Sequence, residues 1–208
     1  MEETLNRNIF IYGDITSEKI EDVMRQLVEI TSYDQLIDKQ IKDYEPELIY
    51  LWICSAGGEV LPVIGLVEYM MHGSTPIVTV CVGEACSAAF MILMAGHFRL
   101  AVRGSSLMAH SMSGGQMGSA RDCAVALEQM KKIESYMVDL MKNKTNIPEK
   151  MIHDMYHVQT DQYMSVEEAL KYKVIDEIYG EPMDDEDDGS DDELEFDEET
   201  DDRPCTLN

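Results

Sequence analysis

Strongly apolar segments, each followed by a helix-like segment, constrain this fold more than any other feature of the chain. Residues 47–54 (ELIYLWIC) and 76–82 (PIVTVCV) are near-continuous hydrophobic runs. Strands of this kind are typical of a parallel sheet that is covered on both faces. Because helices alternate with these strands, the sequence predicts an α/β layered fold with a largely parallel sheet.

The same patterns assign the other elements. Residues 32–46 are polar, and they fit either an insertion or a continuation of the preceding helix. A capping pattern at residues 165–168 predicts one short helix. We expect the remaining strands at 8–12, 98–102, 107–110 and 174–178, and the remaining helices at 17–31, 60–71, 85–95, 120–144 and 148–157.

Charge is spread unevenly along the 208 residues, whose formal net charge is −25. Residues 181–208 carry fifteen acidic residues and one basic residue. We therefore expect one domain over residues 1–180 and a disordered acidic C-terminal tail over residues 181–208. Because Lys and Arg are not clustered, the chain is not expected to bind nucleic acid.

Cysteine usage and the N-terminus indicate a cytoplasmic protein. The five cysteines form no Cys-x-x-Cys pair, and Cys54, Cys81 and Cys86 lie in apolar contexts where a thiol behaves as a small hydrophobe. Met1 leads into two acidic residues rather than a signal peptide. The apolar run at 85–96 is too short to cross a bilayer, so no membrane association is expected.

Ser87 lies where the strand at 77–82 gives way to the apolar helix at 85–95. A hydroxyl at this junction is beside the unpaired N–H groups of a helix N-terminus, where developing negative charge is stabilised. Gly57 and Gly58 end another strand, and glycine allows a backbone N–H to turn into the same pocket. Together these features predict a serine hydrolase.

A serine nucleophile needs a base, and the base needs an orienting partner. Of the five histidines, His110 is the best candidate because it ends a strand and precedes a glycine-rich loop. Asp161 lies in a loop before a helix and could orient the imidazole. The alternative is that Ser87 only caps a helix and that His110 is a hydrogen-bonded core residue.

Four motifs, in the same order, resemble those of the ClpP-type serine peptidases over residues 9–179. Residues 53–60 (ICSAGGEV) resemble the family's strand ending in Asn-Ser-Pro-Gly-Gly, and residues 83–89 (GEACSAA) resemble its Gly-Gln-Ala-Ala-Ser-Met-Gly nucleophile motif. Residues 107–110 (LMAH), with the Gly-Gly pair at 114–115, resemble its base motif. Residues 161–176 resemble its Asp-Arg-Phe-Met-Ser…Leu-Ile-Asp ending.

The resemblance implies a ClpP/crotonase-like fold in which the helix at 120–144 is a protruding handle. It implies Ser87 as nucleophile, His110 as general base, Asp161 as its orienter, and the backbone N–H groups of Gly58 and Ala88 as the oxyanion hole. It also implies a serine endopeptidase for protein and peptide substrates, without a metal or organic cofactor. In this family the subunits form homo-oligomeric rings, stacked as two heptamers, that work with Clp ATPases.

The chain departs from the family pattern at several positions. The family's N-terminal segment, which contacts the ATPase, precedes the first strand, whereas this chain reaches that strand by Ile9, so the ATPase partner is in question. Cys86 and Ala89 replace small residues beside the nucleophile, and residues 111–112 (SM) replace Gln-Pro after the histidine. The short N-terminus and the acidic tail suit a divergent, phage-encoded relative.

Other functions stay open beside this one. The chain could be a specialised processing protease, such as one for phage head maturation, or a catalytically silent ring subunit that scaffolds an active paralogue. An acyl-CoA-handling enzyme of the crotonase fold shares the oxyanion N–H groups but needs no serine. His153 and His157 mimic a His-Glu-x-x-His zinc motif, but Asp replaces the Glu and no third ligand follows, so surface histidines are favoured.

Overall fold

A parallel sheet forms the centre of the molecule. The computed structural model describes residues 5–115, 117–158 and 161–180; the tail expected at 181–208 lies outside the described residues. Among them, the main path of the sheet runs β1-β2-β3-β4-β7, all in parallel. These strands are β1 (Asn8–Tyr12), β2 (Ile49–Ser55), β3 (Ile77–Cys86), β4 (Phe98–Val102) and β7 (Glu177–Tyr179).

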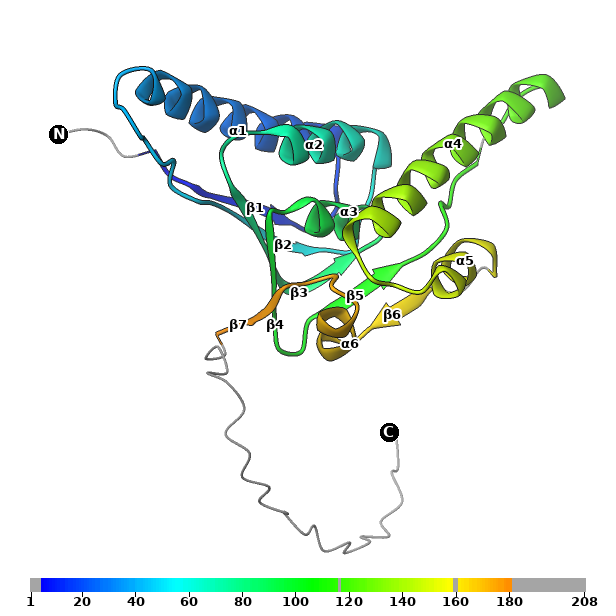
Figure 1. The fold of residues 1–208 in the computed structure, drawn as a ribbon. Coiled ribbons are helices and arrows are strands. Elements are labelled where there is room, and N and C mark those ends of the chain that lie inside the picture. Colours follow the sequence, from blue (N-terminus) through cyan, green and yellow to red (C-terminus); the bar gives the residue numbers. More distant parts are fainter. Residues whose placement is uncertain (1–4, 116, 159–160, 181–208) are drawn as a thin grey trace, which may run out of the picture.

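Two further strands continue from the end of β3. The last residues of β3 pair in parallel with β5 (Ser106–Ala109), and β5 pairs antiparallel with β6 (Gln162–Met164). In Figure 1 this second part of the sheet lies toward α4 and α5, away from the β1 edge. The long strand β3 therefore joins the main sheet to the region where the candidate catalytic residues gather.

Helices cover one face of the main sheet. The helices α1 (Ser17–Asp38), α2 (Val60–His72) and α3 (Ala88–Ala95) lie on the same side (Figure 1). Every residue of α3 is buried, because this helix packs between the sheet, α2 and α4 (Ala120–Lys144). The side chains of β1 and β2 alternate in burial, and the buried set faces these helices, as one-sided cover requires.

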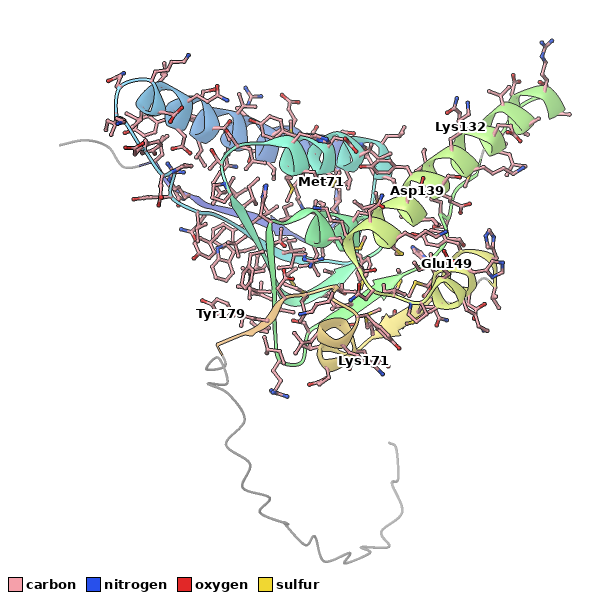
Figure 2. All side chains as sticks on the ribbon, viewed as in Figure 1. Met71, Lys132, Asp139, Glu149, Lys171 and Tyr179 are labelled. Atoms are coloured by element: carbon pink, nitrogen blue, oxygen red, sulfur yellow. The ribbon has the colours of Figure 1, made fainter. Side chains whose placement is uncertain are left out.

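The opposite face of the sheet carries aromatic side chains. Phe10 stacks on Trp52 with ring centroids 6.4 Å apart, and Tyr179 meets Trp52 edge-on at 5.6 Å. Phe10 is 57% exposed in the single chain. Tyr179 lies on the side of the sheet away from α1 and α2 (Figure 2). The sequence predicts a sheet covered on both faces, but helices of this chain cover one face only. An apolar run does not reveal whether the second face is covered by the same chain or by another.

The helix α4 extends away from the body (Figure 1). Its buried residues are confined to its C-terminal part: Met137, Leu140 and Met141. Arg99 fastens this end: its Nη1 donates to the Lys144 carbonyl O at 2.8 Å, and its Nε and Nη2 donate to Asp176 at 2.9 and 2.7 Å. The predicted α/β fold, with its largely parallel sheet and protruding helix, is confirmed.

Several boundaries differ from the expectation. The first helix continues to Asp38, so the first part of 32–46 is helical, and Asp34 anchors it through hydrogen bonds from Arg7, Tyr44 and Thr75. The strand β3 continues to Cys86, so the following helix begins at Ala88 rather than at 85. The short helices α5 (Glu149–His157) and α6 (Val166–Lys171) lie where the sequence places them. In the part of the chain that is described, no helix is long and apolar enough to cross a membrane.

Candidate active site

Ser87 occupies the turn between β3 and α3. Its φ is 56° and its ψ is −120°, a left-handed conformation that side chains rarely adopt and that costs about 1–3 kcal/mol. The Ser87 N–H donates to the Met108 carbonyl O of β5 at 2.8 Å, and the flanking Cys86 and Ala88 are buried. The hydrogen bond to β5 on one side and the buried helix α3 on the other therefore hold Ser87 in this strained conformation.

Gly57 packs directly against this serine. Its φ is +107°, and a Cβ built on it would lie 2.8 Å from the Cys86 carbonyl O and 2.8 Å from Ser87 Cβ. No side chain fits at this contact without displacing the turn or the serine. The first glycine of the Gly-Gly pair is thus required by close approach to the nucleophile.

The backbone N–H groups of Gly58 and Ala88 are the predicted oxyanion donors. Gly58 forms an isolated parallel bridge with Ile15, whose hydrogen bonds use the Gly57 carbonyl O at 2.8 Å and the Glu59 N–H at 2.9 Å. This pairing leaves the Gly58 N–H directed away from Ile15. Ala88 is the first residue of α3, where backbone N–H groups have no partner within the helix. Ala88 directly follows Ser87, and Gly58 directly follows Gly57, which packs against Ser87. That these two N–H groups form the oxyanion hole stays a prediction.

His110 connects Ser87 to Asp161. Its Nε2 lies 2.9 Å from Ser87 Oγ, and its Nδ1 lies 3.2 Å from Asp161 Oδ1. A proton on Nδ1 that is donated to Asp161 leaves Nε2 free to accept the serine proton. The three side chains that the sequence suggests are thus brought together in the order that a nucleophile, a base and its orienter require.

Strand register explains why His110 and Asp161 meet. In the antiparallel pair of β5 and β6, Ala109 is opposite Gln162 and Met108 is opposite Tyr163. The next position of this ladder places His110 opposite Asp161. Antiparallel neighbours are close enough for direct side-chain contact. The pairing thus depends on β6, a strand that sequence reasoning missed because a three-residue strand gives almost no periodic signal.

Cys86 precedes the serine but differs from it chemically. Burial, together with the negative charges of Glu84 and Asp161, raises the pKa of its thiol to about 11. The thiol is therefore protonated at neutral pH, and the thiolate, which is the nucleophilic form, is scarce. The side chain that contacts the base is the Ser87 hydroxyl.

Two glutamates near the site gave no signal in the sequence. Glu134 of α4 is half-buried, and its Oε1 accepts a hydrogen bond from the Met112 N–H at 3.1 Å, two residues beyond the base. Glu59 follows the Gly-Gly turn and accepts a hydrogen bond from Ser17 Oγ. Glu134 lies in a mixed-polarity segment that is typical of a solvent-facing helix, and Glu59 lies between the Gly-Gly pair and the predicted helix at 60–71.

The histidine pair of α5 lies apart from this site. The rings of His153 and His157 are 4.5 Å apart between centroids, and His153 Nδ1 is 3.6 Å from Asp154 Oδ1. Within the described ranges, no group of three or more His, Cys, Asp or Glu side chains gathers as metal ligands do. That the protein needs no metal or cofactor stays a prediction.

Comparison with known proteins identifies the family. The model of the Clp protease family matches residues 2–182. The chain belongs to the Clp protease family. It is 33% identical over 176 residues to an ATP-dependent Clp protease proteolytic subunit of Deinococcus radiodurans, covering 83% of this chain and 80% of that protein. It is 30% identical over 175 residues to the subunit of the same name from Borreliella afzelii, covering 83% and 82%.

Membership of the Clp protease family confirms the predicted ClpP-type resemblance and makes this chain a serine-type peptidase. The relatives are bacterial, and their alignments cover more than four-fifths of this chain. The suggested phage origin stays a prediction. So does the division into a domain at 1–180 and a tail at 181–208.

Proposed function

We propose that this protein is a serine endopeptidase that hydrolyses peptide bonds of protein substrates, as the proteolytic subunit of an ATP-dependent Clp-like protease. Ser87 is the nucleophile, His110 the general base and Asp161 its orienter. The observation that carries the proposal is the contact of His110 with both partners, 2.9 Å to Ser87 Oγ and 3.2 Å to Asp161 Oδ1.

The first half of the reaction acylates Ser87. As Oγ attacks the carbonyl carbon of the scissile bond, His110 Nε2 takes the hydroxyl proton, and Asp161 stabilises the resulting imidazolium. The negative charge on the substrate oxygen is met by the N–H groups of Gly58 and Ala88. Removing one such donor costs a serine protease roughly 100- to 1000-fold in rate. His110 then gives its proton to the leaving amine, and the ester on Ser87 remains.

The second half hydrolyses this ester. His110 takes a proton from a water molecule, the hydroxide attacks the acyl carbon, and the same two N–H groups hold the second oxyanion. His110 returns the proton to Ser87 Oγ as the acid product leaves. Because both oxyanion donors are backbone groups, Ala88 serves in place of the family's methionine.

We propose that the protein works as a homo-oligomeric ring, in which α4 contacts a second ring and a Clp ATPase delivers substrates. Two surfaces of the single chain support assembly. The protruding α4 exposes Val125 and Leu127 at 59% and 52%, and the uncovered sheet face exposes Phe10 and Tyr12 at 57% and 51%. Apolar surface of this extent is typical of protein–protein contact.

Labelling with a fluorophosphonate probe tests the nucleophile. We expect one adduct per chain by intact mass, absent in Ser87→Ala and retained in Ser135→Ala, which removes an exposed hydroxyl of α4 that donates to the Lys131 carbonyl O. Light scattering on the same sample gives the assembly state. Absence of labelling in an assembled ring would contradict the proposal and favour a silent scaffold subunit, whereas equal labelling of Ser87→Ala would place the reactive group elsewhere.

A further inference from the structure

A groove of about 510 Å³ borders the oxyanion turn. The turn and first residues of α2 form one wall, from Gly58 to Pro62; the segment after the base, Met112 and Ser113, forms another; and α4 closes the third side. Gly58 carries a proposed oxyanion donor, and Met112 follows the proposed base by two residues. The groove therefore borders segments next to the proposed oxyanion donor and the proposed base, where a side chain beside the scissile bond of a bound substrate would enter.

The lining of this groove is mostly apolar. Met112, Met130 and Ile133 offer flexible or branched apolar surface, and Ser113 and Gln129 add neutral polar atoms. Glu59 is the only carboxylate among the described lining residues, and no Lys or Arg is among them. Lys132 and Asp139 are also on α4 (Figure 2) but are not lining residues. A single negative charge thus stands at the rim of an otherwise neutral site.

Glu59 is held in place at this rim. Its N–H donates to the Ile15 carbonyl O at 2.9 Å, and its Oε2 accepts from Ser17 Oγ. It is also the N-cap residue of α2, where the helix dipole favours a negative charge. The ammonium of Lys19, two residues after Ser17, donates to the Tyr12 and Asp14 carbonyl oxygens. The carboxylate is therefore oriented, and the described contacts give it no cationic partner from its own chain.

We propose that this groove is a side-chain subsite for the peptide substrate and that Glu59 makes it select Lys or Arg. The inference rests on the proposed peptidase function. Lys and Arg have long aliphatic stems that pack on apolar surface while the charged head stays at a polar rim. An acidic side chain at the same place would meet Glu59 with the same charge. Partly exposed ion pairs of this kind give about a two- to fivefold preference.

Digestion of a synthetic peptide mixture, with the cut sites read by mass spectrometry, measures this preference. For the wild-type protein we expect Lys and Arg to be enriched about two- to fivefold over Gln at one position near the cut. Glu59→Gln should abolish the enrichment, and Glu59→Lys should turn it into a preference for Asp and Glu. Glu18→Gln is the matched control, because it removes the same charge from a neighbouring exposed residue that does not line the groove. Its profile should equal that of the wild type.

Peptide binding to the Ser87→Ala variant tests the same preference independently of turnover. Fluorescein-labelled peptides carry Lys, Gln or Glu at one of three positions and are otherwise identical. Their binding is measured by fluorescence anisotropy with the Ser87→Ala protein, with and without Glu59→Gln. We expect the Lys peptides to bind more tightly and to lose this advantage only with Glu59→Gln, not with Glu18→Gln. An equal effect of both substitutions, or none, would overturn the subsite, because general attraction to an acidic chain then accounts for binding. Fluorophosphonate labelling of Glu59→Gln and Glu18→Gln, each with Ser87 intact, reports separately on the peptidase proposal.

Discussion

Gly57 packs directly against Ser87, the proposed nucleophile, and its replacement by alanine tests whether this contact sets the geometry of the site. A Cβ there would lie 2.8 Å from Ser87 Cβ and from the Cys86 carbonyl O. Non-bonded heavy atoms prefer separations of roughly 3.5 Å or more, so the turn or the serine must move by roughly 0.7 Å. The φ of +107° adds backbone strain, because an L side chain rarely adopts it.

The expected loss follows from these numbers. A displacement of about 1 Å at a reacting group lowers rates by roughly 100-fold, so Gly57→Ala should slow fluorophosphonate labelling of Ser87 by roughly 30- to 100-fold. The strained φ should also lower the free energy of unfolding by about 1–3 kcal/mol. Labelling kinetics need no peptide of known sequence, and thermal unfolding of the same samples separates the effect on reactivity from the effect on folding.

Gly65→Ala is the matched control. Gly65 lies in α2, and a Cβ built on it meets no atom within 4 Å. Alanine is favoured over glycine inside a helix by about 0.5–1 kcal/mol, so this variant should unfold at a higher temperature and label at the wild-type rate. Labelling of Gly57→Ala within threefold of the wild type, in folded protein, would refute the argument that close approach at Gly57 sets the position of Ser87.

Three further predictions concern Asp161, Glu134 and the C-terminal residues 181–208. Asp161→Asn should lower the rates of labelling and peptide cleavage by roughly 100- to 1000-fold. This loss is smaller than for a buried triad acid, because Asp161 is 53% exposed and water can partly replace it beside His110. An unchanged rate would remove Asp161 from the triad. Glu134→Ala leaves the Met112 N–H without its acceptor, so it should destabilise the fold by about 1–2 kcal/mol and slow labelling. Glu134→Gln keeps an acceptor oxygen and should recover most of the stability and of the labelling rate. Equal effects of the two variants would contradict this role of Glu134. Deleting residues 181–208 should leave labelling and the oligomer unchanged, since all the residues of the proposed site precede the deletion, and loss of the oligomer on sizing would count against this.

The local parts of the site could be predicted from the sequence alone. Ser87 between a strand and an apolar helix, and the Gly-Gly pair after another strand, follow from hydrophobic periodicity and from the special dihedrals of glycine. The polar gap at 32–46 could not be resolved in this way. Its first part continues α1, where Asp34 accepts hydrogen bonds from Arg7 and Thr75, which are distant in sequence.

The end of β3 shows a second limit of local patterns. The predicted apolar helix begins at residue 85, yet Ala85 and Cys86 are strand, because they pair with β5 in parallel register. Small and apolar residues fit either state, and only the neighbouring strand decides between them. The consequence is functional, since the helix begins one residue after Ser87, and its first N–H, that of Ala88, is available as an oxyanion donor.

The sequence by itself determined the family, the alternation of strands and helices, and the types of residue that could act as nucleophile, base and orienter. Only the tertiary structure decided that these residues meet. His110 faces Asp161 because β5 and β6 pair in one antiparallel register, and Glu59 and Glu134 enter the site because α2 and α4 pack beside it. The physical reason is that periodicity reports which face of an element is buried, whereas the identity of the neighbour depends on register and packing between distant segments.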